Sequence, residues 1–342
     1  MRSQITYMGE NYDIDAVILW VDGNDENWKR ERDKYIRDNC QDFRINRYRD
    51  WDNLQYIFRG IEKFAPWIRK IFLVTCGHYP NWLKKDCDKL VLIRHENFIP
   101  EKYLPTFSSQ AIDLNLHRIP DLAEHFIYFN DDMFLTNYVK PTDFFRGGLP
   151  TDMFSERPLF SGNGVFSHNI LNIFEVLNRN FCRKEVLKAY RWKILNPKYG
   201  FIFFYNLLWY FLPYKKFSCL FNNHLPMGYR KSIFERVWCA ESDLMWQTVA
   251  NKFRSLTDVN QFIFNYWTLL TGEFVPINMD RQGKLYLIKD ENNSRLFQDI
   301  RKHRYKRICI NDECEDEIFF EVKNELNKCF DMILPEKSGF EI

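Results

Sequence analysis

Residues 125–135 decide the fold that this sequence predicts, and they read His-Phe-Ile-Tyr-Phe-Asn-Asp-Asp-Met-Phe-Leu. Residues 126–129 form a short apolar run, which is typical of a buried strand. Asn130, Asp131 and Asp132 follow at once, so the strand would hold polar side chains at the carboxyl edge of a sheet, where open α/β sheets bind ligands. Two adjacent carboxylates repel each other unless a cation or a proton lies between them. The run therefore indicates either a site for a hard divalent cation or an ordinary turn, because Asn and Asp also favour turns after strands.

Strand and helix patterns alternate on the amino-terminal side of this stretch. Apolar runs at residues 14–21, 71–75 and 90–93 predict strands, and apolar residues at helical spacing over residues 51–64 predict an amphipathic helix. A second helix is expected within residues 104–117, where hydroxyl side chains stand at its start. This alternation predicts an α/β fold with a mainly parallel central sheet and flanking helices.

The composition narrows the class of protein. The chain has 342 residues, of which 46% are hydrophobic and 18% aromatic, so it can fill a sizeable core, and we interpret residues 1–342 as a single catalytic domain. A formal net charge of +2 argues against a non-specific nucleic-acid binder, because such a chain has no strong global field. Residues 1–13 are polar and lack the apolar core of a signal peptide, which predicts a cytoplasmic protein.

The cysteines favour reduced thiols. There are nine of them, an odd number, and they are scattered along the chain. Cys309 and Cys314 lack the repeated close spacing of a zinc site, and the same is true of Cys76 and Cys87. We therefore interpret these cysteines as structural.

Residues 180–220 read as a basic and aromatic helical insertion. Within it, residues 201–212 are almost wholly apolar. A membrane-spanning helix needs roughly 20 such residues, so this run does not span a bilayer. We expect a buried helix here, and the alternative is an aromatic patch that lies in a membrane interface beside basic residues, as a peripheral contact with the inner face of the membrane.

Four blocks of sequence follow one another along the chain: Ile14-Asp15-Ala16-Val17 with Trp20-Val21-Asp22-Gly23; Arg59-Gly60-Ile61 with Leu104-Pro105-Thr106-Phe107 and Tyr128-Phe129-Asn130-Asp131-Asp132; His224-Leu225-Pro226 with Phe253-Arg254; and Ile310-Asn311-Asp312 with Pro335-Glu336-Lys337-Ser338. In this order they resemble the Stealth family of bacterial capsular and exopolysaccharide phosphotransferases, a relative of which is the eukaryotic N-acetylglucosamine-1-phosphotransferase. Two positions depart from the family pattern. Ser108 stands where the family usually has Asn, and Cys76 stands where it often has Asp.

The resemblance implies a nucleotide-sugar transferase with GT-A-like architecture. Its expected reaction moves a hexose-1-phosphate, for example N-acetylglucosamine-1-phosphate, from a UDP-sugar to a hydroxyl of a polysaccharide or glycan acceptor. The products would be a phosphodiester and UMP, so the attack occurs at the phosphorus next to the sugar. Such a reaction needs alignment, a metal ion, positive charge and a base.

The resemblance also implies a residue for each of these roles. Asp131, Asp132 and Asp312 are expected to hold Mg²⁺ or Mn²⁺, with Asp132 also counted as catalytic. Arg254 would stabilise charge on the transferred phosphoryl group, and His224 would take the proton of the acceptor hydroxyl. The residues expected to bind the nucleotide sugar are Asp22, Gly23, Arg59, Thr106, Ser108 and Asn130.

Two other functions stay open at this point. A metal-dependent glycosyltransferase would share the carboxylates at the strand end, but it would not need the distant blocks around His224 and Arg254. A non-catalytic scaffold that docks on the membrane through residues 201–212 would release no nucleotide. Phosphorus NMR of the product separates the first from phosphotransfer, and release of nucleoside monophosphate excludes the second.

Overall fold

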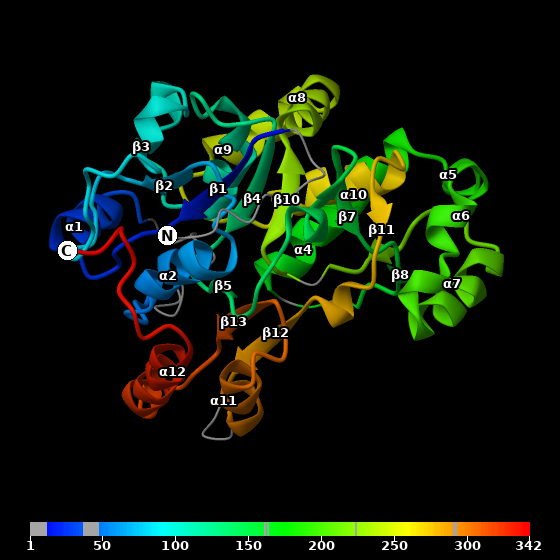
Figure 1. Cartoon of the computed structure of the whole chain (residues 1–342). Coiled ribbons are helices and arrows are strands. Elements are labelled where there is room, and N and C mark those ends of the chain that lie inside the picture. The colour runs from blue at the N-terminus through cyan, green and yellow to red at the C-terminus, as the bar shows by residue number, and fades with distance from the viewer. Residues whose placement is uncertain (1–11, 37–47, 161, 163, 223, 290–292) are drawn as a thin grey trace.

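The structure is a computed structural model that describes residues 12–36, 48–160, 162, 164–222, 224–289 and 293–342. Residues 1–11, which include most of the polar stretch that predicted no signal peptide, lie outside this part. A five-stranded sheet with the order β10-β4-β1-β2-β3 lies at the centre of the molecule (Figure 1). Its strands are β1 (Ile14–Leu19), β2 (Ile71–Thr75), β3 (Leu90–Arg94), β4 (His125–Phe129) and β10 (Met227–Arg230).

Four of these five strands run parallel, as the alternating pattern predicted. β1 pairs with both β2 and β4, and β2 pairs with β3, all in parallel register. Only β10 runs antiparallel, along the edge of β4. The predicted α/β class with a mainly parallel central sheet is confirmed. The predicted strands agree with β1 to β4 to within two residues. β1, β2 and β4 are buried on both faces, whereas the edge strand β3 is buried only in part.

Smaller sheets extend the fold beyond the central one. β5 (Met133–Leu135) follows β4 after a tight turn and pairs antiparallel with β13 (Arg307–Asp312), which itself pairs parallel with β12 (Gly283–Ile288). The turn at residues 130–132 therefore lies where two sheets meet, and the register that pairs Cys309 with Met133 brings the carboxyl-terminal strand beside it. The remaining short strands are β6 (Phe145–Arg146), β7 (Leu149–Asp152), β8 (Glu156–Arg157), β9 (Cys219–Leu220) and β11 (Val275–Pro276).

Helices cover these sheets (Figure 1). The predicted amphipathic helix is α2, which buries Ile57, Phe58 and Ile61 and approaches β5 so closely that a Cβ at Gly60 would lie 3.0 Å from the Leu135 carbonyl oxygen. The α-helices are α1 (Glu26–Asp33), α2 (Leu54–Phe64), α3 (Ser109–Leu114), α4 (Val165–Asn180), α5 (Arg183–Ala189), α6 (Arg191–Ile194), α7 (Phe201–Phe211), α8 (Lys231–Ala240), α9 (Ser242–Ala250), α10 (Phe262–Leu270), α11 (Ser294–Arg301) and α12 (Phe319–Ile333). Short 3₁₀ helices are His95–Asn97, Glu101–Tyr103, Leu116–Arg118, Pro141–Asp143, Pro197–Tyr199 and Met279–Arg281.

A buried ion pair ties the amino ends of the central strands together. Asp15 on β1 is fully buried, and its carboxylate accepts hydrogen bonds from Arg69 Nε (2.8 Å) and from the Ala123 amide (2.8 Å). Arg69 precedes β2, and Ala123 precedes β4. Because a buried carboxylate is tolerated only when it is paired and hydrogen-bonded, this contact holds three strands in register at the edge opposite the predicted site.

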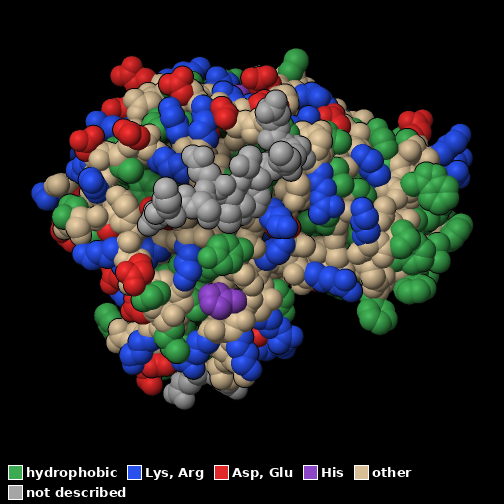
Figure 2. Space-filling view, in the orientation of Figure 1, with side chains coloured by type: hydrophobic (Ala, Val, Ile, Leu, Met, Phe, Trp, Pro, Cys, Tyr) green, Lys and Arg blue, Asp and Glu red, His purple; other side chains and the backbone are tan. Residues whose placement is uncertain are grey.

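The expectation of a buried helix at residues 201–212 is wrong. These residues do form a helix, α7, but Asn206 is its only buried residue, whereas Phe201, Phe204 and Phe211 are 91%, 66% and 74% exposed. Helices α5 to α7 lie at one end of the molecule, and hydrophobic side chains gather at that same edge in Figure 2. The prediction relied on hydrophobicity alone. Residues 201–212 have no distinct polar face, so their sequence does not indicate which side of the helix packs on the core. None of the described helices is long and apolar enough to cross a bilayer.

Candidate active site

The carboxyl ends of β1 and β4 open onto a cavity of about 1060 Å³. Residues from distant parts of the sequence line it, including the end of β13 and the segments that precede β10 and α10. Seven of the eleven predicted site residues are among the lining residues: Thr106, Asn130, Asp131, Asp132, His224, Arg254 and Asp312. The four that do not line the cavity are Asp22, Gly23, Arg59 and Ser108.

The acidic turn connects β4 to β5. The Met133 amide donates to the Asn130 carbonyl oxygen (3.1 Å) and so closes the turn. The carboxylates of Asp131 and Asp132 line the cavity. Asp131 is exposed to the cavity, but the surrounding protein displaces much of the water that would stabilise its charged form. The negative charges of Asp132 and Asp50 also repel it. Together these effects raise the pKa of Asp131 to about 7. A carboxylate pair of this kind favours a bound cation or a proton.

The carboxyl-terminal strand holds Asp132 in place. The Ile310 amide donates to the Asp132 carbonyl oxygen (2.9 Å), and the Cys309 thiol donates to Asp132 Oδ2 (3.3 Å). Oδ1 of the same carboxylate is buried and has no hydrogen-bond partner among the described residues. The interpretation of Cys309 as purely structural is thus corrected, because its thiol orients a carboxylate of the cavity.

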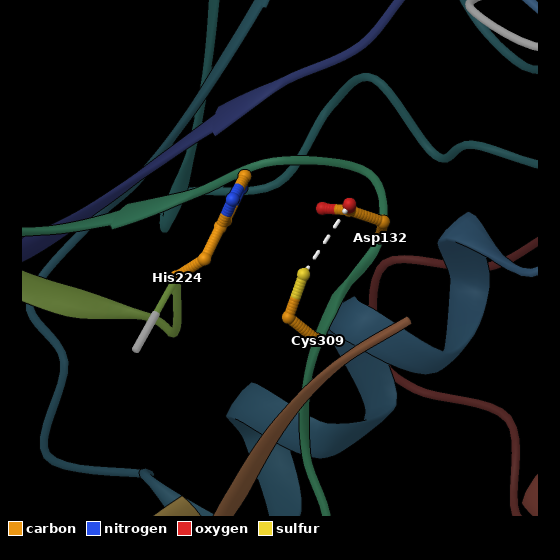
Figure 3. A group of neighbouring side chains, drawn as sticks. All are labelled: Asp132, His224 and Cys309. Atoms are coloured by element: carbon orange, nitrogen blue, oxygen red, sulfur yellow. Dashed lines mark hydrogen bonds between the residues drawn. The ribbon is translucent and has the colours of Figure 1, made fainter. Parts of the chain in front are cut away.

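His224 approaches Asp132 from the segment that precedes β10. Figure 3 shows His224, Asp132 and Cys309 pointing into the same space from three different elements, and one ligand atom from each lies within 4.8 Å of the others. The backbone of His224 has φ +45°, a left-handed conformation that a non-glycine residue rarely adopts, and its amide donates to Asn222 Oδ1 (2.7 Å). Strained residues of this kind gather at functional sites, which supports a functional role for the imidazole.

The donor atoms around Asp132 indicate which metal would fit. Mg²⁺ takes oxygen ligands, which Asp131 and Asp132 supply, whereas a thiol is a ligand only when it is deprotonated. Burial and the neighbouring Asp132 carboxylate raise the pKa of the Cys309 thiol far above its usual value, and the thiol donates a hydrogen bond to Asp132 Oδ2 in this structure. The two carboxylates, with the unpartnered Oδ1 of Asp132, therefore fit a hard divalent cation.

Asp312 lines the cavity but is already engaged by its neighbours. Its Oδ1 accepts from the Cys314 amide (2.9 Å), and its Oδ2 accepts from Trp51 Nε1 (3.1 Å) and lies 3.3 Å from Arg49 Nε. The geometry thus gives no support to Asp312 as a metal ligand and indicates that it positions Arg49 in the wall.

Arg254 brings a positive charge to the cavity. Its Nη2 donates to Ser109 Oγ (2.7 Å) at the start of α3, and no carboxylate forms an ion pair with it in the part of the chain that the structure describes. Burial raises the pKa of Asp131 and of Asp113, and the charge of Arg254 offsets part of that rise. An arginine without an acidic partner in a cavity is suited to bind an anionic group such as a phosphate.

A buried network behind the acidic turn was not predicted. The Tyr128 hydroxyl lies 2.8 Å from Asp113 Oδ1 and 2.5 Å from Asn130 Oδ1, and burial raises the pKa of Asp113 to about 7. A hydroxyl carries a single hydrogen, so it satisfies both oxygens only if one of them brings a hydrogen of its own. The Tyr128 hydroxyl is placed to donate to Asp113 Oδ1 or to Asn130 Oδ1, and the raised pKa of Asp113 favours its protonated form, which supplies a second hydrogen. No short-range sequence signal links Asp113 to Asn130, because Tyr128 connects them only when α3 packs on β4.

Comparison with known proteins assigns the chain to a family. Residues 12–40, 47–151 and 298–342 match the models of Stealth conserved regions 1, 2 and 4, respectively. The chain belongs to the Stealth family. The block that contains His224 and Arg254 lies between the matched ranges.

Relatives of this Stealth chain are similar along nearly its whole length. It is 37% identical to the capsular polysaccharide phosphotransferase WcwK of Streptococcus pneumoniae, over 96% of this chain and 98% of the relative. It is also 37% identical to the exopolysaccharide phosphotransferase cps2G of Lactiplantibacillus plantarum, over 100% of both chains, and to the receptor polysaccharide phosphotransferase WefC of Streptococcus oralis, over 96% of this chain and 99% of the relative. The Stealth chain is therefore a transferase. The glycosyltransferase GlyE of Streptococcus pneumoniae TIGR4 aligns with a TM-score of 0.24 and 9% identity, which is too weak a likeness to support any argument.

Four predicted residues of the Stealth enzyme lie outside the cavity wall. Arg59 donates to both carboxylate oxygens of Glu341 (2.8 and 2.7 Å) and so anchors the carboxyl terminus. A Cβ at Gly23 would lie 1.8 Å from the Tyr48 carbonyl oxygen, so close packing alone requires a glycine there. Ser108 is fully buried at the start of α3, and the Asp22 amide donates to His78 Nε2 (2.7 Å). For these four residues, contact with a nucleotide sugar stays a prediction that the geometry does not support.

The raised pKa of Asp113 predicts a pH dependence of stability for the Stealth enzyme. The folded protein retains a proton on Asp113 that the unfolded chain releases at about pH 4. The contribution of Asp113 to the free energy of unfolding is therefore complete below about pH 4 and is lost as the pH rises through about 7. We expect Asp113→Asn to remove it, and the free energy of unfolding of the variant should fall less than that of the wild type, by a few kcal/mol, between pH 5 and pH 8. Urea unfolding at both pH values measures the difference. The exposed Asp243→Asn serves as the control, and equal pH slopes for wild type and Asp113→Asn would contradict the assignment.

Proposed function

We propose that this Stealth enzyme transfers a hexose-1-phosphate, for example N-acetylglucosamine-1-phosphate, from a UDP-sugar to a hydroxyl of a capsular or exopolysaccharide glycan in the cytoplasm. The products are a phosphodiester and UMP. The names of its relatives support polysaccharide phosphotransfer. The single observation that carries the proposal is that Asp131, Asp132, His224 and Arg254 line one cavity, although more than 90 residues separate the acidic turn from His224.

The chemistry follows from these side chains. The acceptor oxygen attacks the phosphorus next to the sugar and forms a new phosphorus–oxygen bond. The bond between that phosphorus and the bridging oxygen breaks, and UMP leaves with the bonding electron pair. An imidazole nitrogen of His224 takes the proton of the acceptor hydroxyl, and Arg254 stabilises the charge on the phosphoryl oxygens. Thr106 and Asn130, which line the same cavity, contact the donor.

Asp131 and Asp132 would hold the divalent cation, Mg²⁺ or Mn²⁺. The support is the fit of two neighbouring carboxylates to a hard cation and the buried, unpartnered Oδ1 of Asp132. When bound, the cation supplies neutralisation of the diphosphate charge. Cys309 would orient Asp132 through the hydrogen bond of its thiol to Asp132 Oδ2.

The function is tested by a donor screen with Mg²⁺ and a polysaccharide acceptor. UDP-N-acetylglucosamine, UDP-glucose and UDP-galactose are supplied in turn, and the released nucleotide is identified as UMP or UDP. We expect UMP together with a phosphodiester resonance in the phosphorus NMR spectrum of the product. Release of UDP with a product that lacks phosphorus would overturn the proposal, because it would mean glycosyl transfer at the anomeric carbon.

The metal assignment predicts different results for two aspartates of the cavity. We expect Asp132→Asn to raise the Mg²⁺ concentration for half-maximal activity by at least about 10- to 100-fold. Asp312→Asn is the matched control, and it should leave this concentration within a few-fold of wild type because its oxygens already serve Arg49 and Trp51. Mg²⁺ titration of both variants gives the comparison. Full activity of the wild type in excess chelator, or the opposite order of the two variants, would show that the assignment is wrong.

A further inference from the structure

Helix α7 exposes several large apolar side chains and buries a polar one, which is the reverse of an ordinary surface helix. A surface helix buries its apolar side chains and exposes its polar ones. In α7 the only buried side chain is the amide of Asn206, whose Nδ2 donates to the carbonyl oxygens of Phe154 (2.7 Å) and Ile194 (3.0 Å). The exposed residues of α7 are Phe201, Phe204, Leu208 and Phe211, with 62% to 91% of each exposed. Asn206 thus attaches the helix to the protein, together with Ile202 and Tyr210, which pack against the core. Phe201, Phe204 and Phe211 face outward.

The carboxyl end of α7 is held as firmly as its middle. Arg183, which is buried, forms an ion pair with Glu156 (3.0 Å) and donates to the carbonyl oxygens of Trp209 (2.6 Å), Leu212 (3.2 Å) and Tyr214 (3.1 Å). These bonds tie the last turn of α7 and the residues that follow it to a buried ion pair. The outward aromatic face is therefore a preorganised surface, held by buried polar contacts on the side that faces the protein.

Positive charge surrounds this aromatic face. Residues 181–220 contain eight Lys and Arg but a single acid, Glu185, in a chain whose net charge is only +2. Trp192, which is 73% exposed, adds to the aromatic face, and Arg191 stacks on its ring at 4.7 Å. The exposed basic residues of the segment are Lys184, Lys188, Arg191, Lys198, Lys215 and Lys216, and none of them forms an ion pair with a carboxylate in the described ranges. Figure 2 shows hydrophobic and basic side chains together at this end of the molecule.

We propose that α7 and these basic residues dock the enzyme on the surface of a membrane that contains anionic phospholipid. Aromatic and leucine side chains insert at the boundary between headgroups and acyl chains, while lysine and arginine bind the negative headgroups. A protein partner fits less well, because protein interfaces are depleted in lysine. A second copy of this chain would bring two positive surfaces together, and like charges across an interface are unfavourable.

The docking surface borders the active-site cavity. Arg157 lines the cavity, and its guanidinium lies over the rings of Tyr205 on α7 (5.6 Å) and Phe221 (3.9 Å). One side chain thus connects the lipid-facing helix to the cavity wall. A docked enzyme would hold its cavity close to the bilayer, where a membrane-bound acceptor is accessible.

Vesicle flotation of the full chain tests the proposal. We expect the wild type to float with vesicles of phosphatidylcholine and phosphatidylglycerol, and much less with phosphatidylcholine alone. The triple variant Phe201→Ser, Phe204→Ser, Phe211→Ser should lose at least about tenfold in partitioning, since each buried phenylalanine contributes strongly to transfer from water. The double variant Lys215→Glu, Lys216→Glu should bind the anionic vesicles much less than the wild type does.

Matched controls come from other surfaces of the chain. Phe320→Ser removes a phenylalanine that is 72% exposed on α12, and Lys84→Glu, Lys85→Glu reverses two adjacent exposed lysines. Both controls should float like the wild type, and thermal unfolding verifies that every variant is folded. No flotation of the wild type, or wild-type flotation of the triple variant, would overturn the proposal. A dimer in light scattering that the triple variant abolishes, without vesicle binding, would assign the surface to self-association instead. Transfer to an acceptor free in solution should be unchanged, which separates this proposal from the proposed function.

Discussion

His224→Ala is expected to lower kcat for sugar-1-phosphate transfer by about 10²–10⁴-fold, while the affinity for the UDP-sugar stays close to that of the wild type. An imidazole titrates near working pH and suits a general base. The loop before β10 holds this imidazole beside Asp132 at φ +45°, at a cost in backbone strain. Its removal deprives the acceptor hydroxyl of a base without removing any of the proposed donor contacts.

Two measurements separate the role of His224 as a base from a role in binding. Steady-state kinetics gives kcat, and calorimetric titration with the UDP-sugar gives donor affinity. His168→Ala is the control, because His168 lies on α4 between cavity-lining neighbours but does not itself line the cavity. If His224→Ala lost donor affinity and kept its kcat, the residue would be a binding residue and the proposed base would have to be sought elsewhere.

Replacing Arg254 is expected to have an effect of similar size. An arginine that stabilises a transferred phosphoryl group contributes about 10³–10⁵-fold to the rate in well-studied phosphoryl-transfer enzymes, so Arg254→Ala should be nearly inactive. Arg254→Lys should recover only a small part, because an ammonium group cannot reproduce the two parallel hydrogen bonds of a planar guanidinium. Arg254 has no carboxylate partner in the described residues, and its bond to Ser109 leaves the rest of the guanidinium for substrate.

Arg59→Lys is the natural control for this experiment. Arg59 is bound in a bidentate ion pair to Glu341, so its replacement should lower the melting temperature and leave kcat per folded molecule unchanged. Rates from the two lysine variants, each normalised to the folded fraction from thermal unfolding, give the comparison. Wild-type turnover in Arg254→Lys, or an equal loss of turnover in both variants, would refute the phosphate-binding role of Arg254.

Local pattern was sufficient to predict the sheet and its acidic turn. β1, β2 and β4 are apolar runs buried on both faces, and such runs specify strands without knowledge of their neighbours. Helical spacing over α2 specified the helix in the same way. These predictions succeeded because each depends on residues within one element.

Local pattern failed where a residue's surroundings decide its role. Arg59 and Asp312 matched family blocks. However, Arg59 forms an ion pair with Glu341, and Asp312 forms one with Arg49, and both partners lie far away in the sequence. Cys309 lacked any metal-ligand spacing, and only the pairing of β13 with β5 brought its thiol to Asp132. In each case the decisive partner lies more than 150 residues away, beyond the reach of any spacing rule.

By itself, the sequence determined the α/β class, the parallel strands and the position of paired carboxylates at the end of β4, because burial periodicity and turn chemistry act over a few neighbouring residues. The order of its four blocks also identified the family. Only the tertiary structure decided that His224 and Arg254 meet those carboxylates in one cavity, and that α7 presents its aromatic side chains outward. Both outcomes depend on contacts between segments far apart in the chain, where the packing of whole elements determines which side chains meet and which faces stay uncovered.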